Sequence, residues 1–488
     1  MRLELPQIAC GIAGAALVLW ATSDSGVALV HLGMHNAVAA ECLLHGEVWR
    51  TTRGEVFAHW PPLFVLLLAA GRALGASYEA TARGLNALSL AATVMLAMHW
   101  SRKMAPARWV EWLVGAGLLL LPSLLAIHAS LASEPLFLPL VLGSLVAGQA
   151  YAERPRRSML AAATVLAALA CLQRYVGVVD VFAVAGLGFL TWPRSTRLRD
   201  TALFLVGALA PLAVWLARNL ARTGSLTGSR PPSDIEFEQN LLDGWSAIRS
   251  SWTGVGEAGW LGTTLALVSI LLALAGGVAL LATPERRRTA AWVLAFPVAY
   301  VTFLLGLASW IWLDPLDARL LSPLLVWSCM LAPIGAHELL ARVPTSTRRL
   351  RPALFAVASV CALSILGSGA RSIRDRVDAA RVAESGSDVN KSELIRWLRD
   401  HPLAGTVHSN APEAYALAIW RPAQLVPSRR TAEALLALPA SQFPLTLVWF
   451  DPMGTSALQD ERRRKRLRVE TTHQFSDGAI LTVHLRDP

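Results

Sequence analysis

Charged residues are scarce in this chain. They make up 16% of its 488 residues, whereas hydrophobic residues make up 54%. In an average soluble domain about a quarter of the residues are charged, so this composition excludes that class. Together with a mean hydropathy of +0.46, it indicates an α-helical polytopic membrane protein.

Cysteine is also rare, and none of the five cysteines is part of a paired motif. Cys42 lies in a segment expected to be aqueous and the other four fall inside apolar runs, so no disulfide framework is expected. The cysteines are not spaced as metal ligands, and no phosphate-binding glycine loop occurs, so neither a cysteine-bound metal nor nucleotide use is indicated. We therefore expect no cofactor; a divalent cation held by Asp24 and Glu134 is an alternative that the sequence does not support.

Long apolar runs are what the sequence has in abundance. Eleven of them are apolar enough to be considered as membrane spans. They are residues 8–21, 82–100, 110–127, 135–151, 159–172, 176–192, 201–217, 260–282, 290–312, 320–341 and 352–367. The first is short enough for the core of a signal peptide, but a protein with many spans usually keeps such a segment as its first helix, and we expect that here.

Basic clusters set the expected topology. The chain carries 44 Lys and Arg against 34 Asp and Glu, a net charge of +10. The basic residues gather between the runs, at residues 102–108, 154–157, 194–199, 286–288 and 342–351. Two runs separate each cluster from the next, so all of them lie on one side, which the positive-inside rule makes cytoplasmic. The pattern indicates membrane topology rather than nucleic-acid binding.

Whether a twelfth run, residues 61–75, crosses the membrane determines on which side the N-terminus and the segment after the first run lie. It opens with Pro-Pro and contains Arg72, which suits a helix in the interface better than a span. The N-terminus is then cytoplasmic, and residues 22–81 form one long external loop with two or more amphipathic helices. We expect a transmembrane domain of residues 1–370 in the inner (plasma) membrane and a soluble extracytoplasmic domain of residues 371–488.

The expected soluble domain has the pattern of a small α/β unit. Helical spacing begins at Ser392 and runs to residue 402, and strand patterns occupy residues 445–451 and 479–485. The sequence leaves two roles open for this domain, acceptor binding or structural support alone.

Unusual polar motifs all fall on the expected outer face, where polar residues at membrane depth normally serve a function. These are Asp24 after the first run, His59 in "HWPPL", Glu134 in "ASEPLF", Arg174 and Tyr175 in "QRYVG", and Asp317 and Arg319 in "LDPLDARLLSP". Each has a structural alternative, since acids can cap helices, Asp and Arg can form a salt-bridged cap, and a loop can hold any arginine. One outward-facing cavity accounts for all of them together.

The order of these motifs resembles the C-type (GT-C) integral-membrane glycosyltransferases. This superfamily includes the family 39-like enzymes, with the protein O-mannosyltransferases and the lipid A aminoarabinose transferase. The resemblance covers residues 1–370, and "LDPLDARLLSP" is similar to the family pattern D-x-R-[YF]-L-x-P. It implies a GT-C fold, to which the apolar runs and basic clusters give about 11 transmembrane helices. It also implies a membrane glycosyltransferase that takes a hexosyl or pentosyl group from a polyprenyl phosphate, with inversion.

The resemblance also implies roles for single residues. Asp24 matches the general base, Arg319 the arginine that neutralises the lipid phosphate, and His59 a position near that phosphate. Glu134 is expected to line the site. The substrate-binding set is completed by Arg174, Tyr175 and Asp317. Relatives often have two acids after the first helix, whereas Asp24 stands between two serines.

Two other functions share this hydropathy pattern. A transporter of lipid-linked sugars would need a cation for the phosphate, and a structural or sensory membrane protein would use the outer motifs only as caps. Neither should depend on the Asp24 carboxylate. For the enzyme, the expected partners are the lipid bilayer, a polyprenyl-phosphate sugar donor and an acceptor that is a glycan, a lipid or a protein.

Overall fold

The computed structural model describes residues 3–23, 26–253, 259–311, 315–342, 392–426, 431–450 and 467–485. Asp24, Asp314, the span expected at 352–367 and the domain boundary expected at residue 370 therefore lie outside the described residues. The chain divides into a unit made of helices and a unit that contains the β-sheet. We call them the helical unit and the sheet unit.

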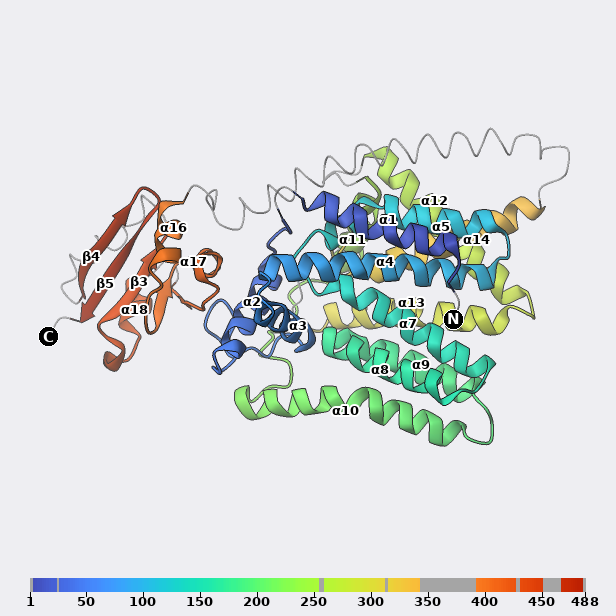
Figure 1. The fold of residues 1–488 in the computed structure, drawn as a ribbon, viewed down its shortest axis with the longest axis horizontal. Helices are drawn as coiled ribbons and strands as arrows, with labels where there is room; N and C mark the ends of the chain where they lie inside the picture. Colours follow the sequence, from blue (N-terminus) through green and yellow to red (C-terminus); the bar gives the residue numbers. More distant parts are fainter. Residues whose placement is uncertain are drawn as a thin grey trace. The chain divides into compact units, whose positions relative to one another are not determined.

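The helical unit comprises the described residues within Met1–Val27, Ala58–Leu63 and Ala82–Val377. Its long helices run side by side with similar axis directions (Figure 1). The helices of this unit, long and short, are α1 (Leu5–Ala21), α4 (Tyr78–Met104), α5 (Arg108–Leu120), α6 (Pro122–His128), α7 (Glu134–Glu153), α8 (Arg157–Gln173), η1 (Tyr175–Gly177), α9 (Val178–Thr191), α10 (Arg197–Thr223), α11 (Phe237–Thr253), α12 (Trp260–Ala282), α13 (Arg287–Ala308) and α14 (Ser322–Arg342).

Six of the described helices are long and apolar enough to cross a membrane: α4, α7, α10, α12, α13 and α14. A seventh span results if α5 and α6, which meet at a bend of 60°, are counted together. The expected spans 8–21, 159–172 and 176–192 coincide with shorter apolar helices, Leu5–Ala21, Arg157–Gln173 and Tyr175–Thr191. The chain is thus a helical multi-pass membrane protein, while the count of eleven spans and their orientation stay predictions.

The doubtful run at residues 61–75 contains a helix, α3 (Leu63–Ala73), of only 11 residues. At about 1.5 Å per residue such a helix is roughly half as long as the hydrocarbon core is thick. Its length therefore supports the expectation of a helix that does not cross the bilayer.

The sheet unit is assembled from segments far apart in the sequence. It comprises the described residues within Ala28–Phe57, Phe64–Thr81 and Asp378–Pro488. Besides α3, its elements are α2 (His31–Leu44), α16 (Glu393–Asp400), β1 (Val407–Ser409), α17 (Pro412–Ile419), β2 (Gln424–Leu425), α18 (Thr431–Leu436), η3 (Ala440–Gln442), β3 (Leu445–Trp449), β4 (Leu467–Phe475) and β5 (Gly478–Leu485). Much of the expected external loop thus belongs to the same compact unit as the C-terminal segment.

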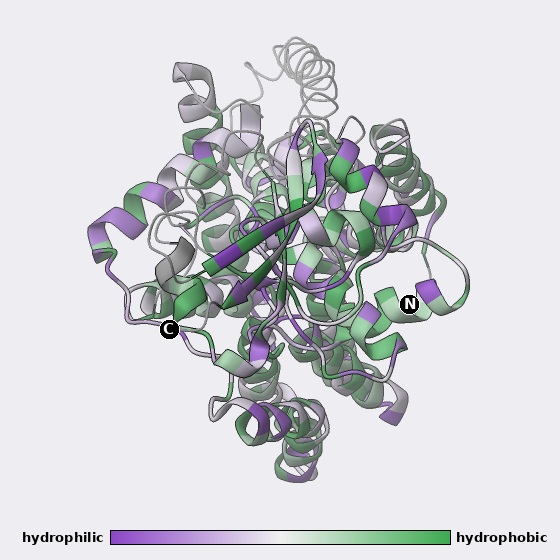
Figure 2. Cartoon of the chain, turned by 90° about the vertical axis from the view of Figure 1, so that its left-hand side faces the viewer, coloured by the Kyte–Doolittle hydropathy of each residue, from purple (hydrophilic) through white to green (hydrophobic). Residues whose placement is uncertain are grey.

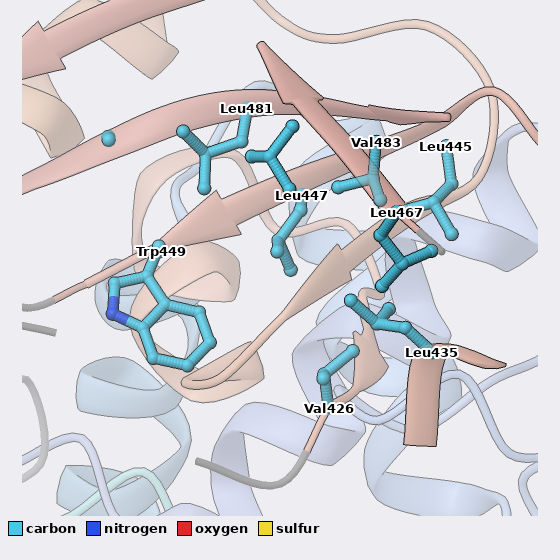
Figure 3. Packing of buried hydrophobic residues seen from close by; sticks show 10 residues of the cluster. Val426, Leu435, Leu445, Leu447, Trp449, Leu467, Leu481 and Val483 are labelled. Carbon is cyan, nitrogen blue, oxygen red and sulfur yellow. The ribbon is translucent and has the colours of Figure 1, made fainter. Parts of the chain in front are cut away.

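The sheet has the strand order β2-β1-β3-β5-β4. Strands β2, β1 and β3 pair in parallel, and β5 pairs antiparallel with both β3 and β4. Leu447, Trp449, Leu481 and Val483 bury their side chains on one face, where Leu435 packs against them (Figure 3). The alternating pattern of the sequence therefore predicted β3 and β5 correctly.

Of two local features of the sheet unit, the start of α16 was expected from the sequence and strand β4 was not. The Ser392 side chain accepts a hydrogen bond from the backbone N–H of Ile395 and so caps α16, at the residue where helical spacing was expected to begin. Strand β4 was not expected, because its central residues are polar and exposed and it follows a basic run. Hydrophilic residues stand out along the strands in Figure 2, as is usual for a strand at the edge of a sheet.

Helix α2 packs against α17 through apolar and polar contacts. Val38, Cys42 and Ala416 form a small buried cluster, so Cys42 is not in an aqueous position. Beside it, Glu413 accepts hydrogen bonds from His31 Nε2 at 2.8 Å and Arg53 Nε at 3.1 Å. Burial opposes the charge of Glu413, but these two partners together lower its pKa to about 2.

We predict that Glu413→Gln destabilises the packing of α2 against α17 by roughly 2 kcal/mol at pH 7. The native pKa lies below the unfolded value of about 4.3, so the carboxylate stabilises the fold above pH 5 and this contribution is lost as the pH falls towards 2. Hydrogen exchange in residues 31–44, corrected for the intrinsic rate at each pH, measures the effect. Glu47→Gln, which removes an exposed ion pair with Arg421, is the control and should change exchange little.

Candidate functional site

A buried ion pair joins the start of α7 to the end of α8. Glu134, the first residue of α7, pairs with Arg174, and their side chains are only 5% and 16% exposed. Ser133 holds the N-cap position of α7, but its side chain makes no capping bond to the helix. Glu134 therefore lies in the first turn of α7, as a capping acid would, and it also forms an ion pair with Arg174 at the end of α8.

The residues around Arg174 explain the "QRYVG" motif. Gln173 Nε2 donates to the carbonyl of Ser133 at 2.8 Å, next to the ion pair. Arg174 leaves the helix in an extended conformation, with φ −149° and ψ 135°, which ends α8. Gly177 lies so close to α8 that a Cβ there would stand 2.5 Å from the carbonyl carbon of Ala170. The motif therefore folds the chain tightly back on the helix that it follows.

The late motif lies beside the same ion pair. Arg319 Nε donates to Asp317 Oδ2 at 2.7 Å, and Asp317 Oδ1 accepts from the backbone N–H of Leu320 at 3.0 Å. This is the salt-bridged cap expected as the structural alternative. Arg319 is nevertheless close enough to the Glu134 and Arg174 side chains to act on their charges.

Tyr300 of α13 completes this group, although the sequence did not point to it. Its ring is 1% exposed, and its hydroxyl donates to the carbonyl of Leu320 at 2.7 Å. It also lies within electrostatic reach of Arg174, Glu134 and Asp317. A tyrosine inside an apolar span gives no motif, so only its position in the fold reveals it. We call Glu134, Arg174, Tyr300, Asp317 and Arg319 the arginine cluster.

Tyr175 is the centre of a second polar network. Its hydroxyl donates to the carbonyl of Ala58 at 2.7 Å and accepts from Trp215 Nε1 at 3.0 Å and Asn219 Nδ2 at 3.1 Å. Asn219 is fully buried. These bonds fix the segment before "HWPPL" to the end of α10.

His59 lies against the loop that follows α10. Its Nε2 is 3.2 Å from the carbonyl oxygen of Ser229, and its own carbonyl accepts from Arg230 Nη2 at 3.0 Å. Gly228 approaches the imidazole so closely that a Cβ would stand 2.7 Å from the ring. Arg218, which directly precedes Asn219, places its guanidinium carbon 4.6 Å from the centre of the Trp215 ring. The loop "RTGSLTGSR" thus places one cation, Arg230, beside His59.

The structure thus pairs Glu134 with Arg174 and Asp317 with Arg319, and it places Arg319 within electrostatic reach of the first pair. Tyr175 and His59 belong to a neighbouring network. The arginine cluster and the Tyr175 network are joined through the backbone, since Arg174 and Tyr175 are consecutive. Asp24 lies outside the described residues, so its expected role as the base stays a prediction. In the part of the chain that the structure describes, no group of three or more His, Cys, Asp or Glu residues could hold a metal ion.

We predict that Gly177→Ala destabilises the chain by roughly 1–3 kcal/mol, because the new methyl group would collide with the backbone of α8. The unfolding temperature of the purified protein in detergent measures this loss. Gly186→Ala, in α9, is a matched control with open space around the added Cβ. Equal unfolding temperatures for the two variants would show that the close approach at Gly177 is unimportant.

Comparison by sequence finds neither a matching family model nor a matching curated protein. Comparison by structure finds several similar chains. ArnT from Cupriavidus metallidurans, bound to undecaprenyl phosphate, is 14% identical with a TM-score of 0.64, and the match covers 97% of each chain. The same protein in the apo state gives a TM-score of 0.63 at 16% identity.

Two further structures have the same architecture. The archaeal oligosaccharyltransferase AglB from Archaeoglobus fulgidus, in complex with an inhibitory peptide and a dolichol phosphate, is 12% identical with a TM-score of 0.57. That match covers 91% of this chain and 69% of AglB. Arabinofuranosyltransferase AftD from Mycobacteria is 14% identical with a TM-score of 0.56, over 100% of this chain and 40% of AftD. These likenesses confirm the resemblance first seen in the motifs: the chain has the fold of the GT-C glycosyltransferases.

Proposed function

We propose that this protein transfers a sugar from a polyprenyl phosphate to an acceptor at the outer face of the inner (plasma) membrane. The observation that carries the proposal is the arginine cluster at one end of the helical unit. The Arg174 guanidinium pairs with Glu134 at the helix start, and that of Arg319 lies within electrostatic reach of this pair. Cations at the end of membrane helices suit a phosphate whose lipid tail stays in the bilayer.

The structural neighbours support the lipid-linked donor. ArnT is bound to undecaprenyl phosphate and AglB to a dolichol phosphate in the structures that this fold matches. The shared fold alone does not carry over a substrate. It agrees, however, with the chemistry that the cluster can perform, and it favours an enzyme over a transporter or a structural protein.

Arg319 is the residue that we assign to the leaving phosphate. Asp317 orients its guanidinium through the 2.7 Å bond to Nε. The side chain is 24% exposed, whereas Arg174 is 16% exposed and held by Glu134. We assign Arg174, Glu134 and Asp317 mainly to positioning, with Arg174 and His59 adding positive potential. A fixed cation in a partly dehydrated site stabilises charge that develops on the phosphate in the transition state.

Asp24 is the residue that we assign as general base. The carboxylate takes the proton of the acceptor hydroxyl while its oxygen attacks the anomeric carbon. The bond between that carbon and the phosphate oxygen breaks on the opposite side, so polyprenyl phosphate leaves and the configuration inverts. The sugar is a hexosyl or pentosyl group. The N-terminus is cytoplasmic and the soluble part of residues 371–488 extracytoplasmic in this scheme.

We predict that Arg319→Gln lowers kcat by a factor of roughly 10²–10³, as expected when one fixed donor to a developing negative charge is removed. Release of polyprenyl phosphate from a panel of polyprenyl-phosphate sugars measures the rate. Arg286→Gln is the control, because Arg286 pairs with Glu338 in a predicted cytoplasmic cluster. An Arg319→Gln enzyme as fast as the Arg286→Gln control would exclude this role for Arg319.

We predict that Asp24→Asn reduces transfer by a factor of roughly 10²–10⁴ or more while leaving expression and unfolding temperature unchanged. The same release assay applies. Asp243→Asn, on the exposed face of α11 where Asp243 accepts from Gln239, is the matched control. Full activity in the Asp24→Asn variant would rule out this carboxylate as the base. A wild-type protein that releases no lipid phosphate from any donor in the panel would count against the enzyme itself.

A further inference from the structure

A groove on the helical unit lies apart from the arginine cluster. It has a volume of about 830 Å³ and is lined by residues of α4, α7 and α8 and of the turn between the last two. These three helices neighbour one another in the fold (Figure 1). A volume of this size is typical of a site for a small molecule or a lipid chain.

The walls of this groove are apolar along most of its length. Leu88, Ala92 and Leu96 recur every four residues and line it from α4, and Leu136 and Leu140 line it from α7. Leu88 is 69% exposed, so the groove opens to the surface of the helical unit. On helices of a multi-pass membrane protein, an open apolar groove faces the hydrocarbon chains of the bilayer.

The charged residues of the groove gather at one end. Lys103, Glu153, Arg154 and Arg156 line that end, and Lys103 pairs with Glu153 at 3.0 Å. Arg154 and Arg156 are exposed and have no ion pair with any residue that the structure describes. With Glu153 matched by Lys103, the two arginines leave this end positive.

The backbone adds to the positive character of the same end. Arg156 is the N-cap residue of α8, and no side chain caps the helix there. The open N–H groups and the dipole of a helix start favour an anion. Because α7 is 20 residues long and begins at Glu134, the basic end lies about 30 Å from the arginine cluster along that helix. It is therefore at the opposite membrane face.

We infer that this groove binds one anionic phospholipid of the leaflet opposite the arginine cluster. The headgroup phosphate lies against Arg154, Arg156 and the start of α8, and an acyl chain lies along Leu88, Ala92 and Leu140. Basic pockets between membrane helices are suited to anionic headgroups. The polyprenyl donor fits less well, because its phosphate would lie at the arginine cluster on the other face. Only its uncharged tail could then reach Arg154 and Arg156, and that tail carries no group for them to bind. The inference does not depend on glycosyl transfer.

The test uses the purified full-length protein in detergent, with bound lipid counted by native mass spectrometry. Phosphatidylglycerol is compared with phosphatidylcholine of the same acyl chains. We expect one tightly held phosphatidylglycerol, and we expect Arg154→Gln/Arg156→Gln to weaken it roughly tenfold or more. Arg194→Gln/Arg288→Gln removes the same charge from exposed positions outside the groove and should leave binding unchanged.

A second variant tests the apolar part without touching the charges. Ala92→Phe fills the groove and should abolish the tight phosphatidylglycerol, whereas Val165→Phe adds the same ring at an exposed position outside the groove and should not. Equal binding of the two phospholipids, or equal losses in each variant and its control, would overturn the inference. Displacement of the bound lipid by an equimolar polyprenyl phosphate would also overturn it, because the groove would then serve the donor.

Discussion

The ion pair between Glu134 and Arg174 is the contact on which the rest of the site depends. Glu134 is almost completely buried and Arg174 is largely buried, and removing two charges from water is costly unless each satisfies the other. The pair can therefore persist only while the start of α7 and the end of α8 stay together. That geometry also sets the position of Tyr175, which comes next in the chain and holds the segment before His59.

Much of this site could be predicted from the sequence because polar residues are conspicuous among apolar runs. Glu134, Arg174 and Arg319 each lie just outside an expected apolar run, and the structure places them within electrostatic reach of one another. Their pairing could not be predicted, because a glutamate before a proline also fits a helix cap and the sequence does not say which cation it meets. Tyr300 was missed for a related reason, since an aromatic residue inside a span is ordinary.

The fold was predictable where one periodicity dominates. Apolar runs gave ten expected spans that coincide with described helices or with the bent α5–α6 pair, and alternation gave β3 and β5. Strand β4 was missed because an edge strand buries little and its polar residues carry no alternation signal. The set of segments that make up the sheet unit could not be predicted either. Contacts such as that of His31 with Glu413 join residues 382 positions apart and leave no local pattern in the sequence.

The sheet unit has a consequence for how the protein is made. Chains are synthesised from the N-terminus, and segments usually fold as soon as their partners exist. Helix α2 is complete early, yet Glu413 and the small cluster around Ala416 are added only near the end of translation. During that interval its packing surface has no native partner. The early segment that contains α2 therefore depends on the last one, and a truncated chain would leave α2 open to proteases and chaperones.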